Sequence, residues 1–266
     1  MTLASYIKTK EIMFNDEITA VSNAARSKSD LLRNNPVGYI FAAVLAGIFI
    51  GTGILLALTA GGLLTGNPFA RIVMGCVFGG ALSLVVMAGG ELFTGNIFVM
   101  AVGFAKKNVS AGVCLKIWAL SYLGNLTGSI ILSVIFVWCG LAAGSVGAFI
   151  SSAAEVKMSI PPLALICRGV LCNVLVCLAV WCSFRCKSEA AKLIMIFWCL
   201  LALLTTGYEH CIVNMTLLTV SLLSPAAGAA VSLSGWIYNI ALSTVGNIIG
   251  GIVFVALPYS VISKQK

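Results

Sequence analysis

The sequence predicts an all-α membrane protein: a six-span helical bundle in which two units of three spans are inverted copies and the second and fifth spans are broken. Composition is the first observation, because 60% of the residues are hydrophobic and only 9% are charged, against about 25% charged in soluble domains. The second is that six stretches reach the roughly 20 residues needed to cross a bilayer. They are 38–60, 69–104 (interrupted), 115–141, 161–184, 193–221 (interrupted) and 233–258.

An internal repeat is the third observation. Gly124-Asn125-x-x-Gly128 in the third span recurs 122 residues later as Gly246-Asn247-x-x-Gly250 in the sixth. Since each copy holds an odd number of spans, the copies must be inverted relative to each other. We therefore expect a first repeat at 38–141 and a second at 161–258, within a single transmembrane domain that spans 1–266.

Basic residues predict the orientation of the spans. With six spans, thirteen of the 16 lysines and arginines fall on one side, and the positive-inside rule makes that side the cytoplasm, with both termini in it. The thirteen are Lys8, Lys10, Arg26, Lys28, Arg33, Lys106, Lys107, Lys116, Arg185, Lys187, Lys192, Lys264 and Lys266. No basic patch interleaved with aromatic residues points to nucleic acid.

The segment before the first span, 1–33, is predicted to hold a cytoplasmic amphipathic helix. Asn15 is placed to cap it, acidic residues occupy its first turn and Arg33 its last, as the helix dipole favours. A modest apolar stripe, Ile18, Val21, Ala25 and Leu32, predicts that residues 16–33 lie on the membrane surface.

Polar residues mark both broken spans at equivalent places. Gly89-Gly90 precedes Glu91 and Asn96, and Thr205-Thr206-Gly207 precedes Glu209 and Asn214, which lie 118 residues further on. A broken helix in a membrane leaves backbone groups that protein or a water-filled cavity must satisfy. The two carboxylates and two asparagines are expected to support these breaks; direct contact with a transported solute is the alternative.

His210, the only histidine, lies in the fifth span. An ionisable group at bilayer depth by default marks a pathway for ions or protons. One histidine and ten cysteines without paired spacing do not make a zinc site, so no metal or other cofactor is expected. An enzyme with Cys211 as nucleophile and His210 as base is a competing class, disfavoured because adjacent residues rarely face each other.

Several segments together resemble the signature segments of the formate/nitrite transporter family, closest to its hydrosulfide channel branch. The resemblance covers essentially the whole chain. The segments are Glu91-Leu92-Phe93-Thr94-Gly95-Asn96, Arg168-Gly169-x-Leu171-Cys172-Asn173, Gly207-Tyr208-Glu209-His210-x3-Asn214-Met215 and Asn35-Pro36-x-Gly38. The resemblance implies an aquaporin-like fold and a homopentamer with one pore through each protomer. The paired Asn-Pro-Ala caps of neutral-solute aquaporins are absent.

The same resemblance implies roles for individual residues. Thr94 and His210 would lie on the loops that break the second and fifth spans, Asn173 would face the pore centre, and Lys157 would sit in the outer vestibule. Two hydrophobic constrictions would bracket the centre, formed by Phe78, Leu82, Phe93, Val176 and Leu203.

These residues predict a channel for small monovalent anions in the bacterial cytoplasmic membrane, and no enzyme. Lys157 and the half-helix dipoles would attract the anion, and polar donors would offset its desolvation cost. His210, whose side-chain type titrates at about pH 6.5, could also lend the anion a proton. Hydrosulfide, whose conjugate acid is the weakest candidate, is the expected substrate, with formate and nitrite also permeating. A nitrite or formate transporter and a proton-coupled symporter are the alternatives.

Overall fold

A computed structural model describes residues 14–263 as helices joined by short loops. The four basic residues Lys8, Lys10, Lys264 and Lys266 lie outside this range, as does part of the predicted segment 1–33. The helices are α2 (Asn15–Asn34), α3 (Pro36–Leu63), α4 (Ala70–Ala88), α5 (Phe93–Ala105), α6 (Ala111–Trp138), α7 (Gly144–Met158), α8 (Pro162–Arg185), α9 (Glu189–Thr206), α10 (Cys211–Leu223), α11 (Leu233–Gly251), the π-helical segment η1 (Ile252–Ala256) and α12 (Leu257–Ile262).

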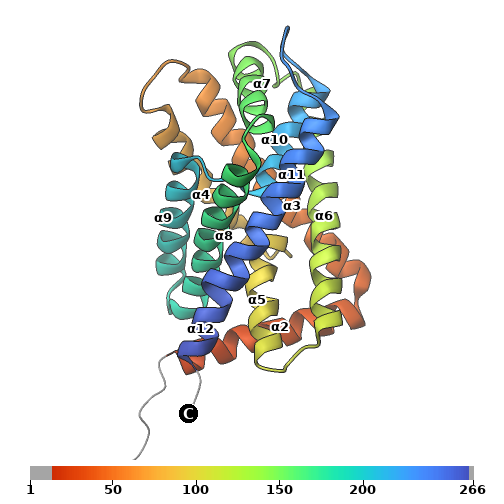
Figure 1. Ribbon diagram of the computed structural model, residues 1–266, viewed down its shortest axis with the longest axis vertical. Helices are drawn as coiled ribbons and strands as arrows, with labels where there is room; N and C mark the ends of the chain where they lie inside the picture. Colours follow the sequence, from red (N-terminus) through yellow and green to blue (C-terminus); the bar gives the residue numbers. More distant parts are fainter. Residues whose placement is uncertain (1–13, 264–266) are drawn as a thin grey trace, which may run out of the picture.

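The predicted fold class is confirmed, because six helices of the described residues are long and apolar enough to cross a membrane. They are α3, α4, α6, α8, α9 and the continuous stretch from α11 to α12. Two shorter apolar helices, α5 and α10, have 13 residues each and follow α4 and α9. The second and fifth spans are thus each split in two, and α5 occupies the lower half of the bundle while α10 occupies the upper half (Figure 1).

Close helix packing explains the repeated Gly-Asn-x-x-Gly segments. A Cβ atom on Gly128 of α6 would lie 2.1 Å from the carbonyl oxygen of Val44 on α3. At the equivalent place in the second repeat, a Cβ on Gly250 of α11 would lie 2.3 Å from the carbonyl oxygen of Val170 on α8. Only glycine lets these backbones approach so closely, as small residues do between membrane helices.

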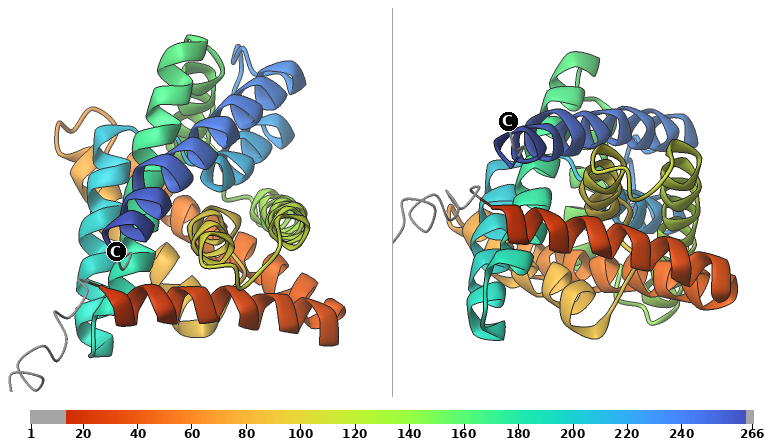
Figure 2. Two further views of the ribbon diagram at one scale, coloured as in Figure 1. Left: turned by 60° about the horizontal axis from the view of Figure 1, so that its bottom comes forward. Right: turned by 90° about the horizontal axis from the view of Figure 1, so that it is seen from below.

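Helix α2 lies across one end of the bundle (Figure 2). All four residues of the predicted stripe are buried: Ile18, Val21, Ala25 and Leu32. The start of the helix differs from the prediction, because Phe14 precedes it with a φ of 63° and no side chain of residues 14–263 caps it. Arg185 of α8 holds this end instead, paired with Glu17 at 2.5 Å and with its guanidinium 4.9 Å from the centre of the Phe14 ring.

The connection between the repeats forms a helix that its composition did not predict. The Gly-, Ala- and Ser-rich stretch 142–160 contains α7, whose buried residues include Ile150 and Ala154. Helix α7 packs against α3 and α10, so tertiary contact stabilises a segment whose own pattern is weak.

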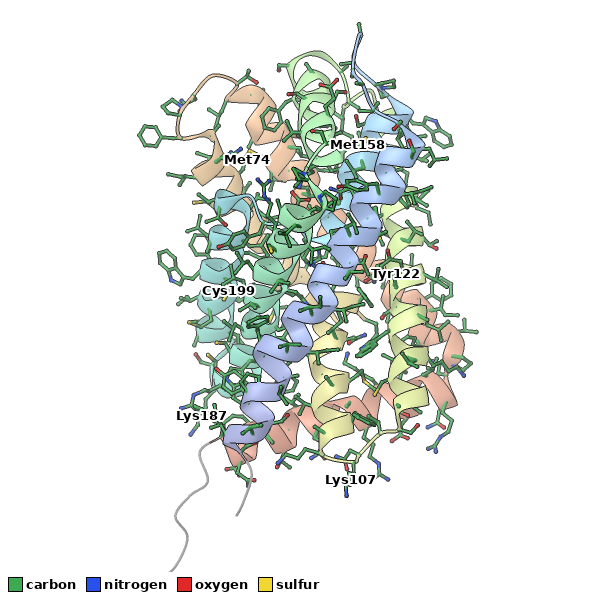
Figure 3. The ribbon with its side chains drawn as sticks, viewed as in Figure 1. Met74, Lys107, Tyr122, Met158, Lys187 and Cys199 are labelled. Atoms are coloured by element: carbon green, nitrogen blue, oxygen red, sulfur yellow. The ribbon has the colours of Figure 1, made fainter. Side chains whose placement is uncertain are left out.

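The sixth span runs further than its predicted end at residue 258, as far as Ile262. Five residues of π-helix, Ile252–Ala256, interrupt it just before Pro258. The lysines Lys107 and Lys187 lie at the end of the bundle that carries α2, and Met74 and Met158 lie towards the opposite end (Figure 3).

Candidate functional site

Asn125 of α6 holds the loop that breaks the second span. Its amide nitrogen donates to the carbonyl oxygens of Ala43 at 2.7 Å and Glu91 at 3.0 Å. Its side-chain oxygen accepts from the backbone N–H of Phe93, the first residue of α5, at 2.9 Å. One buried side chain therefore satisfies two backbone groups of the break, the carbonyl of Glu91 and the N–H of Phe93, and ties them to the backbone of α3.

Asn247 of α11 does the same for the fifth span. Its amide nitrogen donates to the carbonyl oxygens of Gly169 at 2.8 Å and Glu209 at 2.9 Å, and its oxygen accepts from the N–H of Cys211 at 3.0 Å. The sequence indicated these asparagines only as part of a repeat, and their role at the breaks was not predicted. Their recurrence beside glycines in two apolar spans was the available signal.

Each break also carries a buried carboxylate that a lysine and an asparagine bind. Glu91 accepts from Lys28 Nζ at 2.7 Å and from Asn96 Nδ2 at 2.9 Å. Lys28 comes from α2, a partner that the sequence did not predict, because 63 residues separate the two side chains.

Glu209 makes the matching cluster in the second repeat. It accepts from Lys157 Nζ and from Asn214 Nδ2, each at 2.7 Å. Because both carboxylates bind a lysine and an asparagine of the protein, the arrangement favours the interpretation that they support the breaks.

His210 caps α10 and contacts the opposite break. Its Nδ1 accepts from the backbone N–H of Val213 at 3.3 Å, and its Nε2 lies 3.1 Å from Thr94 Oγ1. A ring nitrogen that accepts carries no proton, so we assign the proton of the neutral ring to Nε2. The imidazole then donates to Thr94, and the threonine hydroxyl keeps its own proton free to donate. Both ring nitrogens are thus engaged away from the Cys211 thiol, which argues against a Cys-His catalytic pair.

A narrow cavity of about 10 Å³ lies next to His210. It has about the smallest volume that can hold one water molecule, and its wall is almost wholly apolar. The lining residues are Ile50, Phe78, Leu82, Leu92, Val176, Leu200, Leu203 and His210. The structure brings together four of the five residues expected in the constrictions, since Phe78, Leu82, Val176 and Leu203 all lie here.

Phe93, the fifth residue expected in the constrictions, is not among the residues that line the narrow cavity. Its ring packs edge-on against Tyr122 of α6, with the ring centres 4.9 Å apart. Leu92, the residue before α5, lines the narrow cavity in its place. Adjacent side chains point in different directions, so only Leu92 of these two lines the narrow cavity.

Asn173 of α8 is fully buried and binds backbone. Its Nδ2 donates to the carbonyl oxygens of Asn247 at 2.7 Å and Thr94 at 3.4 Å. It is not among the residues that line the narrow cavity, so it acts on the centre by holding the backbone of Thr94. Its Oδ1 has no hydrogen-bond partner among the described residues.

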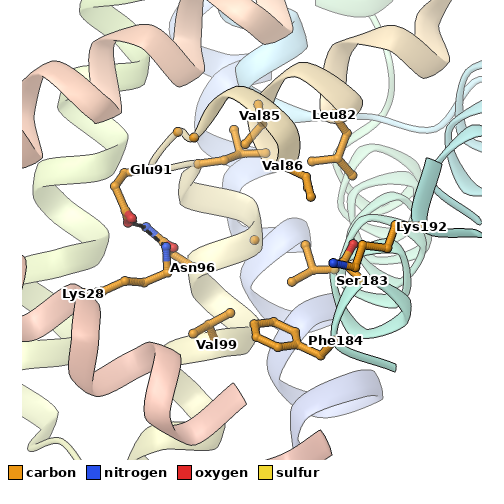
Figure 4. Close-up of a pocket in the computed structure, with 15 residues that line it drawn as sticks. Lys28, Leu82, Val85, Val86, Glu91, Asn96, Val99, Ser183, Phe184 and Lys192 are labelled. Atoms are coloured by element: carbon orange, nitrogen blue, oxygen red, sulfur yellow. Dashed lines mark hydrogen bonds and ion pairs between the residues drawn. The ribbon is translucent and has the colours of Figure 1, made fainter. Parts of the chain in front are cut away.

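Two larger cavities flank the narrow one. The inner cavity, about 440 Å³, is on the α2 side and shares Leu82 and Leu92 with the narrow cavity. Figure 4 shows Lys28, Glu91 and Asn96 on one side of it and Lys192 with Ser183 on the other. The outer cavity, about 490 Å³, shares Leu203 and His210 with the narrow cavity. The three cavities therefore form a series with one apolar narrowing.

Lys157, expected in the outer vestibule, does line the outer cavity, together with Arg71 and Arg168. Its side chain is 18% exposed while it pairs with Glu209. The lysine therefore serves the break and the cavity at the same time. Within residues 14–263, no group of three or more metal-binding side chains is placed to hold a metal ion.

The chain has clear relatives of known family. The sequence profile of the formate/nitrite transporter family matches residues 15–261. The nitrite transporter NirC of Escherichia coli K12 is 41% identical over 250 residues, which cover 93% of this chain and 91% of NirC.

Two solved structures agree with this match. An ion channel of the same family superposes with a TM-score of 0.89 at 36% identity and covers 94% of this chain and 100% of its own. A pentameric formate channel with formate bound superposes with a TM-score of 0.75 at 28% identity and covers 85% of this chain and 96% of its own. These relatives are a transporter and channels rather than enzymes. The chain belongs to the formate/nitrite transporter family.

Proposed function

We propose that the protein conducts small monovalent anions across the cytoplasmic membrane through the inner, narrow and outer cavities. The observation that carries this proposal is the contact of Thr94 with His210 at 3.1 Å. It joins the starts of α5 and α10 beside the apolar narrowing. Two helix N-termini, each with partial positive charge, thus meet where a passing anion would be most dehydrated.

The physical problem for an anion is desolvation. Phe78, Leu82 and Leu203 around the narrow cavity leave little room for water, and an unpaired charge there costs several kcal/mol or more. The donor at hand is the hydroxyl of Thr94, whose oxygen accepts from the Nε2–H of His210 and whose own proton rotation can turn toward the passage. Together with the helix ends it offsets part of that cost.

Proton lending by His210 is the finer part of the mechanism. Proton lending requires that the neutral ring first take up a proton from water in the outer cavity, which reaches His210. The imidazolium then gives a proton to the anion and returns to the neutral ring, and the substrate passes the narrowing as its neutral acid. Thr94 holds the ring in place. Lasting proton transfer across the membrane with the anion would make the protein a symporter, which is the second mechanism to test.

Nitrite is the first substrate to test. The 41% identity to a nitrite transporter over nearly the whole chain supports it, and the structural similarity to a formate channel supports formate as a second permeant. Hydrosulfide, the substrate expected from sequence, remains a prediction that rests on the ease with which this anion takes up a proton.

Assembly and orientation complete the proposal. The similarity to a pentameric channel supports a homopentamer with one passage per protomer. The gathering of basic residues at the α2 end supports a cytoplasmic location of both termini. Mass measurement in detergent tests the first, and labelling of single cysteines from each side of a vesicle tests the second.

Parallel flux assays test the function. Purified protein in liposomes should pass nitrite, formate and hydrosulfide and should carry anion-selective current in planar bilayers. Empty liposomes provide the background, and glycerol-driven swelling checks for a neutral-solute pore. Glycerol flux without any anion flux would overturn the proposal.

A further inference from the structure

Two arginines, one from each repeat, line the outer cavity. Arg71 lies at the start of α4 and Arg168 in the first half of α8, and both side chains are exposed. The same cavity reaches Lys157 and His210. Within residues 14–263, neither arginine forms an ion pair with a carboxylate.

Backbone contacts tie both arginines to the loop that breaks the fifth span. The hydroxyl of Thr205 donates to the carbonyl oxygen of Arg71 at 3.4 Å, and the N–H of Glu209 donates to the carbonyl oxygen of Arg168 at 3.3 Å. Gly207 lies between them with a φ of 78°, and a Cβ there would be 3.8 Å from Nη1 of Arg71. The guanidinium of Arg71 thus lies next to the loop that leads to His210.

The outer cavity keeps an excess of positive charge. Among the described residues that line it, Glu209 is the only carboxylate, and Lys157 pairs with it at 2.7 Å. The charges of Arg71 and Arg168 are therefore not compensated. In the inner cavity, Lys28 is paired with Glu91 at 2.7 Å and Lys192 with Glu189 at 2.9 Å. The outer and inner cavities therefore differ in uncompensated positive charge, although the two breaks make matching hydrogen bonds.

The arginine side chain also imposes a geometry on the anion that it binds. A lysine ammonium is a point charge, whereas a guanidinium is a planar fork that binds two oxygens of one anion at once. Nitrite and formate present two such oxygens; chloride and hydrosulfide do not.

We propose that Arg71 and Arg168 form an outer docking site that holds a planar oxyanion, and that the site favours nitrite and formate over single-centre anions before the narrowing. The inference rests on the proposed anion channel and adds a sorting step to it.

Replacing the two guanidinium groups with lysine ammonium groups tests this site. In the double variant Arg71→Lys/Arg168→Lys, the outside nitrite concentration that gives half-maximal flux should rise threefold or more. The corresponding values for chloride and hydrosulfide should stay unchanged. The variant Lys116→Arg, which alters an exposed residue of α6, is the matched control. If the double variant does not fold, the two single variants should each show a smaller shift of the same sign.

A binding measurement in detergent is independent of transport. Nitrite should raise the Tm of the unaltered protein more than chloride does at equal ionic strength, and the double variant should lose that difference.

Three outcomes overturn the docking site. Equal shifts in the half-maximal concentrations of nitrite and chloride would show that the arginines act only through their charge. An unchanged half-maximal nitrite concentration in the double variant would show that the arginines do not bind the passing anion. An effect confined to liposomes with anionic lipid would assign them to lipid headgroups. A protein that passes no anion at all would instead refute the proposed function itself.

Discussion

The two breaks share a scaffold but differ in what they present to the passage. Asn125 and Asn247 make the same three hydrogen bonds, and Glu91 and Glu209 each bind a lysine and an asparagine. The residue just before the helix that follows each break differs, however: Leu92 precedes α5, and His210 precedes α10. The repeat therefore determines the backbone structure of both breaks. Different residues at equivalent positions, such as Leu92 and His210, give the two breaks different chemistry.

The lysine–glutamate pairs should give the largest effect. Lys157→Met leaves Glu209 buried without its cation, and breaking a buried pair costs about 3–5 kcal/mol. Lys28→Met should cost less, because Glu91 is 10% exposed in its pair whereas Glu209 is 3% exposed. Thermal unfolding in detergent, followed by size-exclusion chromatography, measures both.

The double variant Lys157→Met/Glu209→Gln is the control, since it removes both charges and should recover part of the stability. Equal losses for the two single variants would show that burial does not separate the breaks. Lys157→Glu should also lower anion flux, and an unaltered concentration dependence would reject a steering role for Lys157.

The asparagines come next and should behave alike. Asn125→Ala and Asn247→Ala each orphan buried backbone groups, at about 1–3 kcal/mol per group. Both should lower the Tm by a similar amount. Thr52→Ala, which removes an exposed hydroxyl bound only to its own helix, should change little. A large loss for one asparagine alone would break the structural equivalence of the repeats.

His210 tests the difference in chemistry. His210→Asn keeps a side chain that can cap a helix but cannot exchange a proton, so the protein should fold while its flux becomes less dependent on pH. We expect flux to fall about tenfold, which corresponds to about 1.4 kcal/mol. His210→Leu, which makes both breaks alike, should lose the cap as well, for about 1 kcal/mol of stability. Unchanged flux and pH profile in His210→Asn would refute proton lending.

Leu92 and Phe93 should show the smallest effect. Leu92→Val removes one methylene from the wall of the narrow cavity and should raise nitrite flux less than threefold. Phe93→Leu should leave flux unchanged, because the ring packs on Tyr122. Liposome flux measures both, and the opposite result would place Phe93 in the constriction as the sequence predicted.

Much of the fold was predictable because the signals were local. Apolar length predicted the six spans, Gly89-Gly90 and Thr205-Thr206-Gly207 marked the two breaks, and the repeated Gly-Asn-x-x-Gly segments indicated the two copies. In a bilayer each span must satisfy its own backbone, so sequence pattern maps directly onto helices. Helix α7 was not predictable, because packing against distant elements stabilises it. The π-helical segment Ile252–Ala256 was not predictable either; it lies just before Pro258, which has no backbone N–H to donate.

At the site, the sequence by itself determined which residue types lie at the breaks: two carboxylates, two asparagines, one threonine and one histidine. Only the tertiary structure decided their partners. Lys28 meets Glu91 across 63 residues and Thr94 meets His210 across 116. The tertiary structure also placed Leu92 rather than Phe93 in the wall of the narrow cavity. It brought the side chain of Asn173 within hydrogen-bond distance of the carbonyl oxygens of Thr94 and Asn247. Spacing along a chain fixes a side chain's helix and height, but its direction depends on the helices that pack around it.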